Sequence, residues 1–243
     1  MASPLEQFEI IDLSKPLFMI GKVPISFTNS AAFMFAAVGI ASVFLIAAGS
    51  QKQLVPGRLQ GLAEMLYDMV AGMIRDNVGD AGKKYFPFLF SLFIFILFGN
   101  MLGMIPYTFT FTSHIAVTFA MAFAIFIVIT LIGIFRHGLH FFSLFFPHGA
   151  PLATAPILIP IEVISYLSRP VSLSVRLFAN MTVGHVLLKV LAGFVVALGF
   201  IGGWVPLLVL VGITALEFLV AFLQAYIFTI LCCIYLNDAL HLH

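Results

Sequence analysis

Charged and polar side chains gather in an apolar stretch between residues 168 and 189. The stretch carries Arg176, Asn180 and His185, and Glu162 lies shortly before it. A charge at the centre of a membrane helix costs about 2.5–3.5 kcal/mol on insertion scales. Such charges are therefore kept where they are paired, hydrated or used. Because arginine, histidine and carboxylate groups inside membranes mark ion pathways, we expect this stretch to be the functional centre.

Helix geometry places these side chains on two different faces, because a helix turns by about 100° per residue. Asn180 and Glu162 both lie within about 40° of Arg176, whereas His185 lies about 180° away from it. A site for one ligand would gather its groups on one face. A helix that separates two aqueous paths needs polar groups on both faces, and the sequence favours this second arrangement.

Two polar residues of the last apolar run continue the pattern. Glu217 and Gln224 are seven residues apart and therefore share one helix face. We expect Glu217 to meet His185 across a helical hairpin, and Gln224 to meet Arg176. Asn100, which interrupts an earlier apolar run, is a further candidate for an ion pathway.

Structural roles are the alternative for each candidate. Arg176 could form a buried ion pair with one of the two glutamates. His185 could be a core histidine whose hydrogen bonds are satisfied. The amides could join helices by hydrogen bonds, as polar side chains do between membrane helices, and for Asn100 this role is favoured.

The composition places these residues in a membrane protein. Of the 243 residues, 62% are hydrophobic and 9% are charged, and the mean hydropathy is +1.16. An ordinary soluble domain is about 45–50% apolar and about 25% charged. The net charge of +1 comes without a basic cluster, so we expect no binding of nucleic acid. We expect an all-α polytopic protein with a single membrane domain over residues 1–243.

Apolar runs predict five membrane helices and one amphipathic helix. The expected segments are a tail at 1–30, spans at 31–50, 86–106 and 114–136, an amphipathic helix at 56–77 and a helical hairpin at 153–240. The amphipathic helix is expected at the bilayer interface, with packing on a partner subunit as the alternative. Each half of the hairpin is about twice the roughly 20 residues that cross a bilayer, which predicts two strongly tilted antiparallel helices. Bends are expected at Pro170 and Pro206, and the turn at Gly202-Gly203.

Lysine and arginine predict the orientation of the chain. They are concentrated in the loop at 51–85 and absent from the loop at 106–113. Because short cytoplasmic loops carry the excess of positive residues, the first of these loops is expected inside and the second outside. Five passages then place the N-terminus outside and the C-terminus inside.

Three histidines, His137, His140 and His148, lie close together after the third predicted span. Their spacing matches no metal-ligand motif, and neither cysteine nor carboxylate accompanies them. We therefore expect no metal site there, and nothing in the sequence predicts a cofactor.

Three stretches of the sequence resemble subunit a of F-type ATP synthases. They are FGNMLGMIPYTFTFTSH at 98–114, PIEVISYLSRPVSLSVRLFANMTVGH at 160–185 and LEFLVAFLQAYIF at 216–228. The resemblance covers most of the chain from Leu54 onward, and the RLFxN core with the last-helix glutamine is specific. It implies a proton-translocating stator that lies beside a ring of small proteolipid rotor subunits, each with a carboxylate at mid-membrane.

The resemblance also implies roles for individual residues. The family's channel-lining acidic position, essential arginine, neighbouring asparagine and last-helix glutamine fall on Glu162, Arg176, Asn180 and Gln224. In some bacterial members the acidic group follows the arginine and the histidine lies on the last helix. Here His185 and Glu217 exchange these places, so a contact between them across the hairpin is implied.

Partners follow from the same resemblance. It implies the rotor ring, peripheral stalk subunits, the lipid bilayer and, through the complex, a catalytic ATPase head. By itself the chain is then a proton-channel subunit and not an enzyme. The positive loops on the inner side and the N-terminal tail favour a bacterial inner membrane over a mitochondrial one. The main alternative is a self-contained ion channel or secondary transporter, against which the lack of an internal repeat counts. A purely structural subunit is the second alternative, and polar groups on both faces count against it.

Overall fold

The computed structural model describes residues 10–13, 18–20, 23–50, 55–105, 108–138, 140–141 and 154–241. In chain order the elements are β1 (Phe18–Ile20), β2 (Val23–Ile25), α1 (Asn29–Ser50), α2 (Arg58–Asn77), the 3₁₀ helix η2 (Asp80–Tyr85), α3 (Phe86–Gly103), the 3₁₀ helix η3 (Phe111–Ser113), α4 (Ile115–His137), α5 (Ala155–Gly202) and α6 (Trp204–Leu240). Two strands of three residues pair as an antiparallel hairpin, which the sequence had not indicated. All longer elements are helices, so the predicted all-α fold is confirmed. Three expected features lie outside the described residues. They are the end of the second span at Pro106, the start of the hairpin at Ala153, and His148.

Five helices, α1, α3, α4, α5 and α6, are long and apolar enough to cross a membrane. Their large apolar side chains point outward as well as inward: the exposed fraction of Phe35 on α1 is 71%, and that of Phe135 on α4 is 86%. Apolar residues on all sides of a helix are expected where lipid replaces water around the protein. The chain is therefore a polytopic membrane protein, as predicted.

The helix α2 is amphipathic. Its buried face consists of Leu66, Val70, Met73 and Ile74. Its charged residues are exposed, and they are Arg58, Glu64, Asp68, Arg75 and Asp76. This division reproduces the helical spacing of apolar residues in the sequence. The location of α2 at the bilayer interface stays a prediction.

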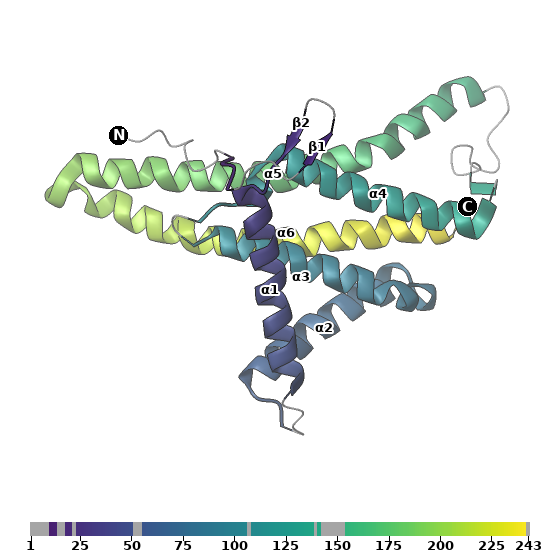
Figure 1. Cartoon of the computed structure of the whole chain (residues 1–243), viewed down its shortest axis with the longest axis horizontal. Coiled ribbons are helices and arrows are strands. Elements are labelled where there is room, and N and C mark those ends of the chain that lie inside the picture. Colours follow the sequence, from purple (N-terminus) through teal and green to yellow (C-terminus); the bar gives the residue numbers. More distant parts are fainter. Residues whose placement is uncertain are drawn as a thin grey trace.

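The helices α5 and α6 form a long antiparallel hairpin, and Figure 1 shows them side by side with α1 crossing them at a large angle. The 48 residues of α5 correspond to about 72 Å of helix. The hydrocarbon core of a bilayer is about 30 Å thick. A helix of this length within the membrane must be steeply tilted, so a small part of the bilayer depth is crossed per turn.

Proline does not break α5. The backbone dihedral angles stay helical through Pro160 and Pro170 and depart from helical values only at Gly199, with φ 63° and ψ −162°. Figure 1 shows α5 changing direction along its length while the ribbon stays continuous. Pro206 lies in the first turn of α6, where its missing N–H has no helical partner to lose. The turn of the hairpin therefore begins at Gly199, three residues before the expected Gly202-Gly203.

Close helix packing holds the hairpin against the rest of the molecule. The core includes Phe93 of α3 and Phe228 of α6, both fully buried. The ring of Phe111 in η3 lies against Gly99 of α3, at a point where any side-chain carbon would collide with it. In membranes such contacts rely on small residues and van der Waals packing. As a result of this packing, η3 contacts α5 next to the predicted functional centre.

Candidate functional site

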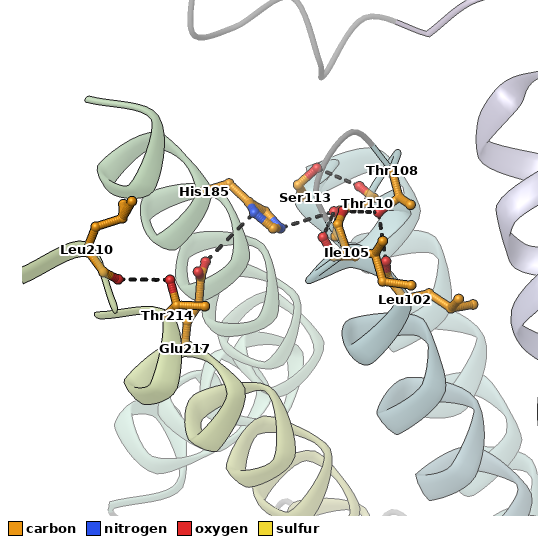
Figure 2. A network of polar contacts seen from close by, with 10 residues as sticks. Leu102, Ile105, Thr108, Thr110, Ser113, His185, Leu210, Thr214 and Glu217 are labelled. Carbon is orange, nitrogen blue, oxygen red and sulfur yellow. Dashed lines mark hydrogen bonds and ion pairs between the residues drawn. The ribbon is translucent and has the colours of Figure 1, made fainter. Parts of the chain in front are cut away.

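His185 is the centre of a buried polar cluster (Figure 2). Its imidazole Nδ1 lies 3.8 Å from Oε1 of Glu217 on α6. Its Nε2 lies 3.0 Å from the Oγ1 atom of Thr110, close enough for a hydrogen bond. His185 and Glu217 therefore lie next to each other across the hairpin, as expected from the sequence. An imidazole with a hydroxyl at one ring nitrogen and a carboxylate at the other is arranged to accept a proton on one side and release it on the other.

The Glu217 carboxylate lies in a notch beside Gly184. The exposed fraction of Glu217 is 5%, and neither carboxylate oxygen has a hydrogen-bond partner among the described residues. A side-chain carbon added at Gly184 would collide with this carboxylate. The gap of 3.8 Å to His185 is too long for a direct hydrogen bond, so the carboxylate keeps capacity to accept a proton.

The segment before α4 completes the cluster, and residue-by-residue reasoning on the sequence had not singled it out. The Ser113 hydroxyl donates to the backbone carbonyl of Thr110 at 2.5 Å. The Thr182 hydroxyl of α5 donates to the carbonyl of Ser113 at 3.2 Å. These are neutral side chains in an apolar loop. The sequence indicated them only by the threonine and serine residues that alternate with phenylalanine at 108–113.

Asn180 and Gln224 form a second link between α5 and α6. The Asn180 Nδ2 donates to Oε1 of Gln224 at 2.7 Å. Gln224 was expected to meet Arg176, but the structure gives it the amide one turn further along α5. Asn180 and Arg176 lie within about 40° of each other on one face of α5, so a side chain of α6 that faces one of them can also reach the other. The pair joins the two helices beside Arg176.

Arg176 is half-buried and lies near the middle of α5, 21 residues after Ala155 and 26 before Gly202. Within the part of the chain that the structure describes, no hydrogen bond or ion pair joins its guanidinium to another side chain. The ion pairs considered from the sequence, with Glu162 or Glu217, are therefore not formed. Glu162 is half-buried two turns before Arg169 on the same helix.

A further charged cluster surrounds Arg169, a residue of the predicted functional centre whose partners the sequence did not indicate. Its guanidinium lies 2.9 Å from the Asp238 carboxylate at the end of α6. The rings of Tyr166 and Tyr235 lie under the same guanidinium, with centroids at 5.2 and 4.8 Å. The Tyr166 hydroxyl in turn shares a hydrogen bond of 2.7 Å with Thr130 of α4. The ion pair and the cation–π contact with Tyr235 thus join α5 to α6, and the hydrogen bond of Tyr166 joins α5 to α4.

Asn100 lies in the contact between α3 and α6. Its Nδ2 donates to the backbone carbonyl of Ala221 at 3.2 Å, and its side chain is fully buried. This geometry is that of an interhelical hydrogen bond, which is the role the sequence favoured for it.

His137, the last residue of α4, makes a contact with the end of α6. The Nε2 of His137 lies 3.1 Å from the carbonyl of Leu240, at the end of α6. Among the residues that the structure describes, no group of three or more histidine, cysteine or acidic side chains could hold a metal ion.

Comparison with known proteins decides the family. A family model described as ATP synthase A chain matches residues 31–237. The chain belongs to the ATP synthase A chain family. An ATP synthase subunit a of Rhodospirillum rubrum is 63% identical over 245 residues, which cover 100% of both chains. That of Paramagnetospirillum magneticum is 59% identical with 100% of both chains covered. That of Pelagibacter ubique is 53% identical over 99% of this chain and 98% of the relative.

Membership in the ATP synthase A chain family confirms the resemblance seen in three stretches of the sequence. It makes the chain part of a complex with other ATP synthase subunits. The relatives named above are bacterial, and five helices can cross a membrane. The chain is therefore a multi-pass protein of a bacterial inner membrane.

Proposed function

We propose that the chain is the proton-translocating stator of a rotary ATP synthase and that Arg176 separates two offset half-channels. The observation that carries the proposal is the state of Arg176. It lies in the middle of a steeply tilted helix, half-buried, without a hydrogen-bond or ion-pair partner in the described part of the chain. Such a charge in a membrane helix is retained when a partner outside the chain uses it.

The two half-channels correspond to the two polar clusters on α5. His185 lies nine residues after Arg176, about 14 Å along the helix, and leads through Glu217 and Thr110 to the outer side. Arg169 lies seven residues before Arg176, about 10 Å along the helix. Glu162 lies seven residues before Arg169, further toward the inner side. Each cluster offers proton-accepting groups on one side of Arg176 only.

The partner that would use Arg176 is a carboxylate on each subunit of a rotor ring. An ionised carboxylate in hydrocarbon is too costly, so it must be protonated while it faces lipid. Beside the guanidinium its ionised form is favoured, because an opposite charge stabilises it. Arginine stays charged under all ordinary conditions, so it acts as a fixed electrostatic gate and repels a proton that would pass straight through.

The membrane potential supplies the driving force for proton passage. Each proton that crosses gains about 2.3 kcal/mol per 100 mV. A carboxylate releases its proton into one half-channel before it passes Arg176 and takes a new one from the other half-channel afterwards. Asn180 and Gln224 hold α5 against α6 beside the gate. In this proposal ATP is made by a catalytic head that peripheral stalk subunits hold.

The gate is tested by Arg176→Ala in membranes that contain the whole synthase. We expect proton-driven ATP synthesis to be lost, while the amounts of this chain and of the bound ATPase head stay normal. Arg176→Lys is expected to be impaired as well, because a desolvated lysine can lose its proton. The matched control is Arg75→Ala on the exposed face of α2, which should leave synthesis near the wild-type rate. Normal coupled synthesis with Arg176→Ala would refute the gate.

A further inference from the structure

Three pairs of polar side chains join α5 to α6 at three levels along the hairpin. From the end of α6 toward the turn, they are Arg169 with Asp238, Asn180 with Gln224, and His185 with Glu217. The first two pairs are 11 residues apart on α5 and 14 on α6, and the last two are 5 and 7 apart. A shift of α6 along α5 by one helical turn, about 5.4 Å, would therefore separate all three pairs at once.

The short turn of the hairpin does not hold this alignment rigidly. It contains Gly199, Gly202 and Gly203, and glycine has more backbone freedom than any other residue. Near the turn the exposed fraction is 76% for Val196 of α5 and 71% for Val205 of α6. Figure 1 shows this part of the hairpin extending beyond α3 and α4. The alignment of the two helices is therefore secured from the other end.

Opposite charges between aromatic rings join the two helices at that other end. The side chains of Arg169 and Asp238 are 24% and 31% exposed, and their closest atoms are 2.9 Å apart. An ion pair that is fully open to water contributes little, because water screens it. Here the rings of Tyr166 and Tyr235 cover the guanidinium and attract it through cation–π contacts. The rings also fix the direction from which the carboxylate approaches.

The helix α4 supports the ion pair from both sides. Its Thr130 shares a hydrogen bond with Tyr166, which lies three residues before the arginine on α5. Its His137 contacts the carbonyl of Leu240, two residues after the aspartate on α6. A carbonyl oxygen only accepts, so Nε2 of His137 is the donor. The end of α6 is thus held against α5 and α4 together.

We propose that Arg169 and Asp238 are positioning residues that set the register of α6 on α5. The ion pair keeps Gln224 and Glu217 level with their partners on α5, beside the gate. This inference rests on the function proposed above, and it gives the ion pair the task of alignment. Glu162 then remains the group that can exchange a proton on that side of the gate.

The spacing of the cluster makes its two charges exchangeable. Tyr166 lies three residues before Arg169, and Tyr235 lies three residues before Asp238. Residues three apart are neighbours on a helix surface, so each charged position has a tyrosine beside it on its own helix. With Asp238→Arg the new guanidinium would therefore meet the same two rings, and Arg169→Asp would supply its carboxylate.

Exchange of the charges tests the positioning role in the whole synthase. Arg169→Asp and Asp238→Arg each place like charges opposite each other. Each should slow ATP-driven proton pumping about tenfold, which corresponds to about 1.4 kcal/mol. The double variant restores the attraction and should regain most of the wild-type rate. Arg136→Gln, an exposed arginine at the end of α4, is the control and should pump normally. A double variant that is present in normal amount but as slow as the single variants would overturn the proposal.

A disulfide between α5 and α6 reads the register directly, after both natural cysteines have been replaced by alanine. Met181 and Ala221 are fully buried in one small cluster, so Met181→Cys/Ala221→Cys should form a cross-link on oxidation. Leu177→Cys/Ala225→Cys gives a second reading one turn closer to the ion pair, and both of its positions are fully buried in the core. It replaces the first pair if that variant does not assemble.

Removal of either charge should change this reading. Adding Arg169→Gln or Asp238→Asn to the cysteine pair should lower the initial rate of cross-linking several-fold, because α6 then occupies more than one register. Adding Arg136→Gln should leave the rate unchanged. Equal rates with and without the ion pair would overturn the positioning role, whatever the effect of the substitutions on pumping.

The positioning role and the gate fail separately. Cross-linking reads the alignment of two helices without any movement of protons. Coupled synthesis surviving in Arg176→Ala would remove the half-channels, while the cross-linking rates would still decide whether the ion pair sets the register. A defective Arg176→Ala together with an unchanged cross-linking rate in Arg169→Gln would remove the positioning role alone.

Discussion

At the scale of single residues, the site depends on where a side chain is missing as much as on where one is present. Gly184 precedes His185 directly, and its lack of a side chain leaves the space that the Glu217 carboxylate fills. The histidine and the glutamate therefore face each other because a glycine stands beside them. Sequence spacing alone predicts that the two residues share a side of the hairpin, but it does not predict this notch.

Gly184→Ala tests the notch. The added methyl group would push the Glu217 carboxylate away from His185, so we expect ATP-driven proton pumping to fall several-fold while the complex still assembles. Gly193→Ala is the control on the same helix, because a side-chain carbon there meets nothing within 4 Å. Proton pumping by inverted membrane vesicles, followed by fluorescence quenching, measures the difference. Wild-type pumping by Gly184→Ala would contradict the importance of this contact.

The residues that sequence reasoning identified and those that it missed differ in one physical respect. His185 and Glu217 are ionisable residues in apolar runs, and an ionisable residue in such a run is visible from the sequence alone. Thr110 and Ser113 are neutral, and their effect depends on the path of a loop. Asp238 was missed because its pairing with Arg169 depends on how far α6 slides along α5, which periodicity does not determine.

At the scale of elements, the hairpin turn depends on one glycine with a positive φ angle. Gly199 has φ 63° and ψ −162°, a conformation that residues with a side chain rarely adopt. The sequence predicted the turn at the next pair of glycines because two adjacent glycines are the stronger local signal. Gly199 and Gly202 lie within one helical turn of each other. The sequence therefore predicted that α5 exists, but not the residue at which its helical backbone ends.

Gly199→Ala should weaken the hairpin. Holding a residue with a side chain in such a backbone region costs about 1–3 kcal/mol. We expect a lower thermal stability of the detergent-solubilised complex, followed by the loss of this chain from it on heating. Gly212→Ala on α6 is the control, since it has open space and should be neutral or slightly stabilising. An unchanged transition for Gly199→Ala would show that the turn tolerates a side chain.

At the scale of the whole molecule, the fold class and the five apolar helices follow from composition and run length, while their arrangement does not. The amphipathic pattern of α2 predicts its buried face, and that face consists of Leu66, Val70, Met73 and Ile74. The crossing of α1 over the hairpin in Figure 1 follows from packing between distant segments. No local pattern in the sequence encodes that angle.

The orientation of the molecule gives a prediction at this scale. The distribution of positive residues predicts that the ends of α1 and α6, at residues 50 and 240, lie on the inner side. Green fluorescent protein fused after residue 50 or after residue 241 should therefore fluoresce, since it folds in the cytoplasm. Alkaline phosphatase fused after residue 113 should be active, since it needs the outer side. The opposite pattern would invert the assignment of the two half-channels.

One uninterrupted helix carries both Arg169 and His185, 16 residues apart, which corresponds to about 24 Å of helix. The backbone stays helical from one to the other, through Pro170, so helix geometry determines their spacing. Under the proposed arrangement of two half-channels, the arc between proton loading and unloading is then a constant of the protein. A ring with a different number of subunits would change how many carboxylates fit within that arc, while the arc itself would stay the same.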